Sequence, residues 1–155
     1  ETRTFDPDTG LIASSTGPNS LTTSWTHDAF GRVTREDRAD GTYTTTAREV
    51  CEGAVFYCPS NAVIRTQTLQ SSGGEESIWT DRLLREVLRS TTQLAGQPLA
   101  VVHTGYDGVG RMQMRSEPRK WDAAWENTKW TNITYDLLGR PIVTTRPDNS
   151  TQLVT

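Results

Sequence analysis

The sequence is short of the residues that fill a large dry core. Only 34% of its 155 residues are hydrophobic and 8% are aromatic, and the mean hydropathy is −0.60. Ordinary globular domains use about 45–50% apolar residues, a benchmark that also counts glycine. The shortage suits a sheet with at least one solvated face, because a strand with alternating side chains needs only every second residue to be apolar.

Other missing features argue against whole classes of function. The formal net charge of −3 gives no reason to expect a nucleic-acid partner, because such partners are usually met by a clustered basic surface. No run approaches the roughly 18 apolar residues of a membrane span, and no charged-then-apolar secretory signal opens the chain. The sequence begins at Glu1 and stops at Thr155 in the middle of a pattern, so we expect an excerpt of a longer protein.

Cysteine is also scarce, with only Cys51 and Cys58 present. A structural zinc site needs four ligands, and His27 and His103 lie at no metal-ligand spacing, so no metal is predicted. A local disulfide across a loop is the favoured use, and it would stabilise the fold by about 2–3 kcal/mol. Two buried, unpaired thiols remain the alternative.

What the sequence does contain is an internal repeat. Three segments follow the order aromatic, Asp, two variable positions, Gly, Arg, and they are His27–Val33, Tyr106–Met112 and Tyr135–Pro141. In two degenerate copies, Leu84 replaces the glycine or Gly10 comes one place late. Such recurrence indicates an array of similar supersecondary units. The motif residues with a predicted structural role are Asp28, Gly31, Arg32, Asp81, Arg85, Tyr106, Asp107, Gly110, Arg111, Tyr135, Asp136, Gly139 and Arg140.

A second turn signal follows four of the motif copies. It comes twelve residues after the motif aspartate, at Pro18, Asp40, Arg119 and Asp148, in strings that are mostly typical of turns. Two turns per repeat predict two strands per repeat. Asp28 and Asp81 are 53 residues apart, about twice the shorter intervals, so one repeat is expected to be altered or lost where the cysteines lie.

The segments between the turns favour strands. They are short, β-branched or alternating, and bounded by turn residues. The exception is Ile78–Leu88, where a helical stripe is an alternative, but Asp81 and Arg85 keep the motif spacing and favour a hairpin. We therefore predict an all-β fold of consecutive antiparallel hairpins, side by side in a twisted, curved sheet. The whole chain, 1–155, is expected to be a single segment with irregular loops near 51–60 and 118–131.

Each motif position has a physical role. The aspartate can accept hydrogen bonds from backbone N–H groups about two residues on, and the glycine suits a positive φ or a bulge. We therefore expect Gly31→Val to be more damaging than Ala29→Val. The arginine can satisfy carbonyls at the turn or pair with a carboxylate of the next hairpin. The aromatic residue is expected to pack on the motif aromatic one repeat along.

None of the motif residues is predicted to be catalytic. Because the aspartates recur at the repeat period, they do not form the single carboxylate pair of a glycoside hydrolase. No Gly-x-Ser-x-Gly string occurs, and His103 has no identifiable partner in the sequence. Gly105, Gly108 and Gly110 fall in the wrong order for a nucleotide-binding loop. No cofactor is predicted.

At these residues the sequence resembles the Rhs/YD-repeat family. Tyr135–Arg140 followed by Pro147-Asp148-Asn149 is a near-complete copy of the family motif, and the stretch from Cys51 to Arg65 is also similar to a segment of bacterial members. The resemblance implies large secreted or cell-surface proteins, such as bacterial polymorphic toxins, insecticidal toxin complexes and teneurins. In these proteins, similar repeats form a spiralling shell around a C-terminal cargo domain. The family's self-cleavage motif is not recognisable here, so no catalytic residue is carried over.

Two further partners are considered. Trp121, Trp125 and Trp130 crowd into one insertion, and exposed aromatic residues can stack on sugars or anchor a cell-surface partner. Packing of a longer loop onto the sheet is the favoured alternative for these tryptophans. Self-association through unpaired sheet edges is also expected in an isolated segment.

Overall fold

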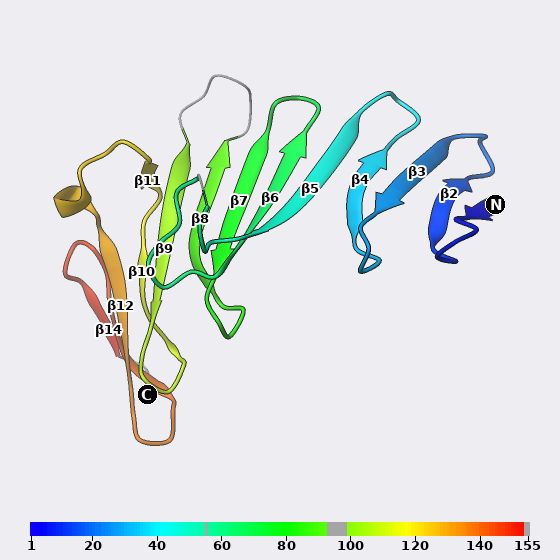
Figure 1. Ribbon diagram of the computed structural model, residues 1–155. Coiled ribbons are helices and arrows are strands. Elements are labelled where there is room, and N and C mark those ends of the chain that lie inside the picture. The colour runs from blue at the N-terminus through cyan, green and yellow to red at the C-terminus, as the bar shows by residue number, and fades with distance from the viewer. Residues whose placement is uncertain (55, 93–98, 154–155) are drawn as a thin grey trace.

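The computed structural model describes residues 1–54, 56–92 and 99–153, which form one open antiparallel sheet with a single short 3-10 turn (Figure 1). The all-β prediction is confirmed. The elements of the described chain are β1 (Thr2–Phe5), β2 (Ile12–Thr16), β3 (Thr22–His27), β4 (Val33–Asp37), β5 (Tyr43–Val50), β6 (Ile64–Gln70), β7 (Glu75–Thr80), β8 (Glu86–Thr92), β9 (Ala100–Tyr106), β10 (Met112–Ser116), β11 (Arg119–Lys120), η1 (Trp125–Asn127), β12 (Trp130–Tyr135), β13 (Pro141–Thr145) and β14 (Thr151–Leu153).

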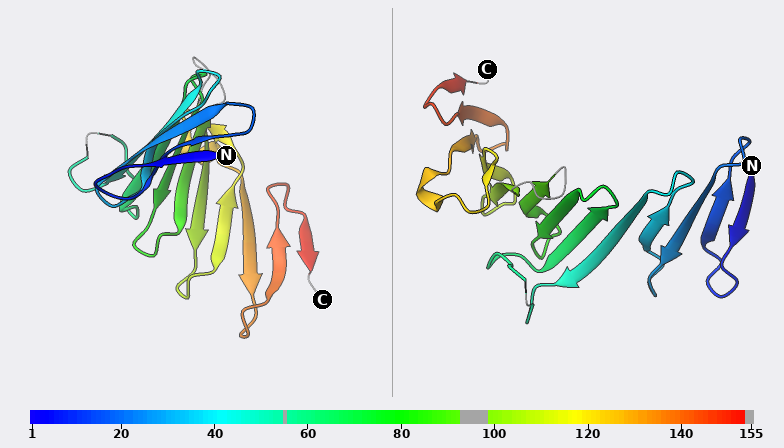
Figure 2. Two further views of the ribbon diagram at one scale, coloured as in Figure 1. Left: turned by 90° about the vertical axis from the view of Figure 1, so that its right-hand side faces the viewer. Right: turned by 90° about the horizontal axis from the view of Figure 1, so that it is seen from above.

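The strands lie side by side in the order of the sequence. Each one pairs antiparallel with the next from β1 to β14, except that β11 leaves this path and pairs with β9. Seen from above in Figure 2, the sheet bends along its length, so that the C-terminal strands turn away from the plane of the N-terminal ones. The predicted meander of hairpins in a curved sheet is therefore what forms.

In such a meander, successive connections lie alternately at one end of the strands and then at the other. The motif turns all lie along one rim, which is the lower edge of the sheet in Figure 1. The β5–β6 connection, residues 51–63, lies on this same rim in the place of a motif turn. This loop explains the long interval between Asp28 and Asp81, because the strands of the altered repeat are kept and only its turn has been replaced.

The segment Ile78–Leu88 forms a hairpin, as favoured, and not a helix. Strands β7 and β8 pair from Glu75↔Thr92 to Thr80↔Glu86. Leu84, which stands in the place of the motif glycine, has a φ of 60°. The turn geometry is thus maintained without glycine, at the energetic cost of a left-handed backbone for a residue with a Cβ.

The expected turn at Pro118–Lys120 is wrong. Arg119 and Lys120 instead form β11, which extends the β9–β10 pairing through Arg119↔Val101 and Lys120↔Ala100. The chain turns back later, and the Glu117 N–H donates to the Lys129 carbonyl where the excursion closes. The composition around Pro118 suits a turn, but the free edge of β9 beyond β10 offers backbone partners that keep this segment extended.

The core lies on one face of the central strands. Trp79 is directly opposite Leu88, and Ser90 is opposite Val101, so alternation places all four side chains on the same face of β7, β8 and β9. All four are buried, and the loop after β5 contributes Ala62 to the same cluster. Outside this cluster most side chains of the sheet are only partly buried, which agrees with the low hydrophobic content.

Candidate functional site

The repeated motif turn is the most regular feature of the molecule. In the Asp107 copy, one carboxylate oxygen accepts hydrogen bonds from the Val109 N–H at 3.0 Å and the Arg111 N–H at 2.8 Å. The other oxygen accepts the Arg111 Nε–H at 2.7 Å. The same three hydrogen bonds recur in three more turns, whose aspartate and arginine are Asp28 and Arg32, Asp81 and Arg85, and Asp136 and Arg140. The aspartate thus holds both the backbone and the arginine of its own turn.

The glycine of the motif has a left-handed backbone. The φ angles are +76° at Gly31, +94° at Gly110 and +82° at Gly139. In the first copy, with its one extra residue, Gly10 takes this conformation at +70° and its N–H donates to the Asp6 carbonyl. A side chain at these positions is strained by about 1–2 kcal/mol.

Successive motif turns are tied together by the arginines. The guanidinium of Arg85 lies over the ring of Tyr106 at 4.3 Å from its centroid, and that of Arg111 lies over Tyr135 at 4.5 Å. The expected contact between motif aromatics is wrong, because none of the ring pairs found in the described chain joins two of them. A cation–π contact between an arginine and the next motif tyrosine therefore connects these repeats, and a contact between two aromatic rings does not.

Each of these tyrosines is also fixed by its hydroxyl. The Tyr106 O–H donates to the Glu86 carbonyl at 2.9 Å, and the Tyr135 O–H donates to the Met112 carbonyl at 2.6 Å. Both acceptors follow the arginine of the preceding motif turn directly in the chain. The tyrosine is therefore held at two points by the preceding repeat, through its face and through its hydroxyl.

The arginine of the preceding motif turn gives a second reason for glycine at this position, because it lies where a side chain would begin. A Cβ built at Gly110 would lie 3.1 Å from Nη1 of Arg85, and one at Gly139 would lie 3.6 Å from Nη1 of Arg111. At Gly31 the neighbouring side chain is Leu11, whose Cδ1 would lie 3.4 Å from a Cβ built on the glycine. The glycine therefore has two roles. It allows the left-handed backbone of its own turn, and it leaves room for the side chain that approaches from the preceding repeat.

The electrostatics of the motif turns are those of structural ion pairs. Hydrogen bonds from the backbone and side chain of Arg140 lower the pKa of Asp136. At Asp81 and Asp107, burial acts to raise the pKa, but the hydrogen bonds from Arg85 and Arg111 outweigh it and the net pKa is lowered. A general acid needs a raised pKa, so these carboxylates are shifted in the opposite direction.

Residues 5–43 match the family model described as RHS Repeat. Over this stretch the chain is similar to the Rhs/YD-repeat family. The match runs from the last residue of β1 to the first residue of β5 and includes the Asp28 turn. A comparison with curated proteins finds no match. The hydrogen bonds of the matched Asp28 turn recur at Asp81, Asp107 and Asp136, so the same turn geometry returns outside the matched residues.

The arginine ties of the RHS array are interrupted at the altered repeat. The turn that would follow Arg32 has been replaced by the 51–63 loop, and the Arg32 guanidinium lies over Phe30 of its own turn at 4.9 Å. At the other end, the side chain of Arg140 is 73% exposed. The described ladder therefore runs from the Asp81 turn to the Asp136 turn.

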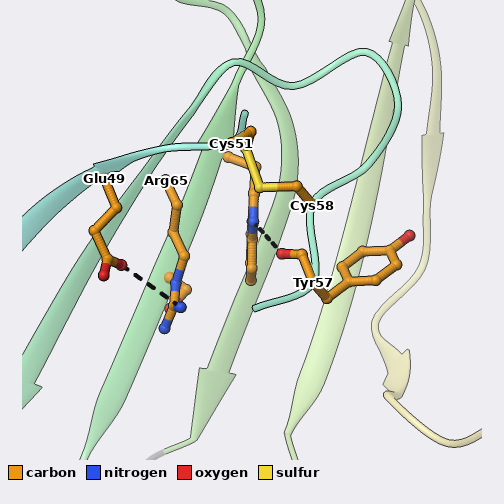
Figure 3. Close-up of a disulfide and its surroundings, with 7 residues drawn as sticks. Glu49, Cys51, Tyr57, Cys58 and Arg65 are labelled. Atoms are coloured by element: carbon orange, nitrogen blue, oxygen red, sulfur yellow. Dashed lines mark hydrogen bonds and ion pairs between the residues drawn. A yellow bond between two sulfur atoms is a disulfide. The ribbon is translucent and has the colours of Figure 1, made fainter. Parts of the chain in front are cut away.

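The altered RHS repeat is closed by a disulfide between Cys51 and Cys58 (Figure 3). The indole N–H of Trp79 donates to the Tyr57 carbonyl at 2.9 Å, which anchors the loop over the core. Arg65 lies over the ring of Phe56 at 4.6 Å and pairs with Glu49 at 3.7 Å. Of the two uses weighed for the cysteines, the structure has the disulfide, and the loop that it closes covers the buried face.

The three tryptophans of the insertion pack against ring partners. Trp121 meets Tyr57 of the disulfide loop edge-to-face at 4.9 Å, and Trp125 meets His103 in the same way at 4.9 Å. Trp130 lies 5.6 Å from Trp125. Sequence analysis missed His103 as a member of this cluster, although alternation along β9 places it on the face of the buried Val101. Burial and the nearby Arg119 cation lower the pKa of His103.

The described residues contain neither a metal-ligand cluster nor a helix that could span a membrane. Within 1–54, 56–92 and 99–153, no three His, Cys, Asp or Glu side chains gather in a way that could hold a metal ion. No helix in this part of the chain is long and apolar enough to cross a membrane.

Proposed function

We propose that the chain is a non-catalytic wall segment of a β-sheet shell, which encloses a C-terminal cargo domain in a larger secreted or cell-surface protein. The observation that carries the proposal is the tie from one motif turn to the next, with Arg85 on Tyr106 and Arg111 on Tyr135. A tie that repeats every hairpin fixes the angle between neighbouring hairpins. A constant angle turns a long ribbon into a regular curved wall.

The first and last described strands of the sheet each have one unpaired side. In the described part of the chain, β1 pairs only with β2 and β14 pairs only with β13. Strands with an unpaired side bind further strands readily, so additional RHS repeats of the parent protein would continue the sheet at either end. In an isolated segment the same edges would support self-association.

The chemistry of the motif aspartates supports the absence of catalysis. Each of the four aspartates is held by its own arginine at 2.7–2.8 Å. Side chains that are already paired in the same way in four separate turns are suited to holding backbone in place. A catalytic group is instead expected at one position and with a pKa matched to its task.

Protease protection of the parent protein tests the proposal. The cargo domain of the intact parent should resist a protease that digests the same domain when it is expressed alone. Combined Arg85→Ala and Arg111→Ala substitutions should increase the rate of cargo cleavage. Arg32→Ala serves as the matched control, because the Arg32 guanidinium lies over Phe30 of its own turn. Cargo that is cleaved equally fast inside and outside the parent protein would contradict encapsulation.

A glycan-binding or adhesive role is the second candidate, and the exposure of two tryptophans favours it. Trp125 is 56% exposed and Trp121 is 39% exposed. Their edge-to-face contacts with His103 and Tyr57 favour packing instead. Titration of a sugar panel against tryptophan fluorescence separates the two roles. Saturable shifts that disappear in folded Trp121→Ala or Trp125→Ala would favour binding.

A further inference from the structure

The two rims of the sheet differ in the chemistry of their tight turns. On the motif rim, the second central residue of four turns is apolar, and these residues are Phe30, Leu83, Val109 and Leu138. The remaining motif turn of this rim begins at Asp6, is one residue longer, and has the polar Asp8 and Thr9 at its tip. On the opposite rim, four tight turns lie in the described part of the chain, and their second central residues are all polar: Asn19, Asp40, Ser72 and Asp148. Polar residues, glycine and proline normally dominate such positions. Turn formation therefore explains the polar rim and leaves the apolar one unexplained.

The apolar turn residues are not buried by the sheet. Phe30, Leu83, Val109 and Leu138 are 84%, 71%, 76% and 79% exposed. Beside Leu138, Leu137 is fully exposed at 105%. Isolated exposed apolar side chains are common, but a row of them along one edge marks an interaction surface. We call this row, Phe30, Leu83, Leu84, Val109, Leu137 and Leu138, the apolar rim.

We propose that the apolar rim is a docking surface for the apolar rim of a second copy of this chain. The turns bearing Leu83, Val109 and Leu138 join consecutive pairs of strands, so their tips are about 9–10 Å apart at the usual strand spacing. A second copy is a partner with the same spacing. When two copies are related by a twofold axis, each apolar turn residue of one copy can contact an apolar turn residue of the other, as in an isologous interface.

The charges on the rim permit this approach. The aspartate and arginine of each motif turn are paired with one another, at 2.7 Å for both Asp28 with Arg32 and Asp107 with Arg111. Two rims that meet therefore bring together motif turns whose aspartate and arginine are already compensated, and the exposed Arg82 beside Leu83 is the charge that has to stay in solvent. Large unpaired charges of one sign would have opposed the contact.

The available area predicts a weak dimer. Six side chains of this kind offer about 400–700 Å² per copy, from the transfer free energy of such residues and its value per unit area. A stable interface buries about 800 Å² per partner. The association is thus expected to be reversible and to depend on concentration between micromolar and millimolar protein. This interface is separate from the sheet edges β1 and β14, which pair through their backbones.

Sedimentation equilibrium of the chain and of a rim variant tests the proposal. The variant combines Leu83→Asn, Val109→Asn and Leu138→Asn, because asparagine is a preferred turn residue and should leave the fold intact. Its dissociation constant should be about tenfold or more higher than that of the native chain. The control is Leu21→Asn, which removes an exposed leucine away from both the apolar rim and the sheet edges, and it should dimerise like the native chain. Equal melting temperatures of all three proteins establish that they are folded.

A photoreactive side chain at Leu137 identifies the occupant directly. It should yield a covalent dimer, whereas the same group at Ser72 on the opposite rim should not. A native chain that stays monomeric to millimolar concentration would overturn the proposal, and so would a rim variant that dimerises as tightly as the native chain. Crosslinking from Leu137 to added phosphatidylcholine vesicles, with no dimer, would replace the second copy by a lipid surface. None of these outcomes depends on a cargo domain.

Discussion

The guanidinium of Arg111 lies over the ring of Tyr135 while its Nε remains hydrogen-bonded to Asp107 at 2.7 Å. One side chain thus belongs to two repeats at once. Its Nη1 also donates to the Asp136 carbonyl at 3.4 Å. The planar group of arginine allows these contacts together, because its edge binds the carboxylate while its face covers the ring.

The first prediction concerns this shared arginine. Arg111→Lys should lower the free energy of unfolding by about 1–2 kcal/mol, because lysine has no planar group to cover the ring while binding the carboxylate. Arg140→Lys is the matched control, since Arg140 has the same aspartate contact and covers no tyrosine ring in the described chain. Urea denaturation measures both. Equal losses in the two variants would show that the tie between repeats contributes nothing.

The second prediction separates the two roles of the motif glycine. Gly110→Ala and Gly41→Ala both place a Cβ at positive φ, which should destabilise each by about 1–2 kcal/mol. Only Gly110→Ala also forces the new Cβ toward Arg85, since a Cβ at Gly41 meets nothing within 4 Å. Gly110→Ala should therefore give the lower melting temperature. Identical melting temperatures would argue against a role for the arginine approach.

The structure explains why Gly31→Val is expected to be more damaging than Ala29→Val. Gly31 has a φ of +76°, and a Cβ there would meet Leu11 at 3.4 Å. Gly31→Val should accordingly lower the melting temperature more than Ala29→Val, whose side chain lies in the exposed part of the turn. A larger loss for Ala29→Val would contradict this account of the turn.

The third prediction concerns acid. The folded pKa of Asp107 is lowered by the Arg111 hydrogen bonds, despite burial, so the unfolded chain takes up the proton first as the pH falls. Its contribution to stability is present above the unfolded pKa of about 3.9 and is lost as the pH falls through the lower folded value. Thermal unfolding between pH 6 and pH 2, roughly the range in which paired carboxylates titrate, should show a steeper fall for the native chain than for Asp107→Asn. Parallel curves would contradict the assignment.

The fourth prediction concerns the disulfide. Replacing Cys51 and Cys58 by alanine should lower the free energy of unfolding by about 2–3 kcal/mol, because the open loop gains entropy in the unfolded chain. Trp79 should become more exposed, since its indole N–H donates to a carbonyl of this loop. A reductant should produce the same fluorescence shift in the native chain. It should have no further effect on the alanine variant, and a shift there would show that the signal comes from elsewhere.

The motif turns could be predicted because their contacts are local. The Asp136 carboxylate accepts its hydrogen bonds from Leu138 and Arg140 of the same turn, so residue types at fixed spacing are enough to specify them. The alternation of turns along the chain then gave the hairpins. The same local logic failed at Arg119, because a backbone edge supplied by β9 is not visible from the residues around Pro118.

The contact between repeats could not be predicted in the same way. Tyr106 and Tyr135 stand on β9 and β12, with β10 between them, so their backbones are about 9–10 Å apart. Aromatic pairs need ring centroids about 4.5–7 Å apart, and the long side chain of Arg111 reaches across where a second ring does not. The partners depend on strand register and on side-chain length together.

The sequence alone determined that this protein is a meander of hairpins, because the acid, glycine and arginine of each turn act within five residues of one another. Only the tertiary structure decided which side chains join the hairpins, how the disulfide loop covers Trp79 and Leu88, and that the apolar turn residues form one rim. These features depend on which strands become neighbours and which faces meet. Such relations are set by pairing and burial over the whole sheet, and not by any single stretch of the chain.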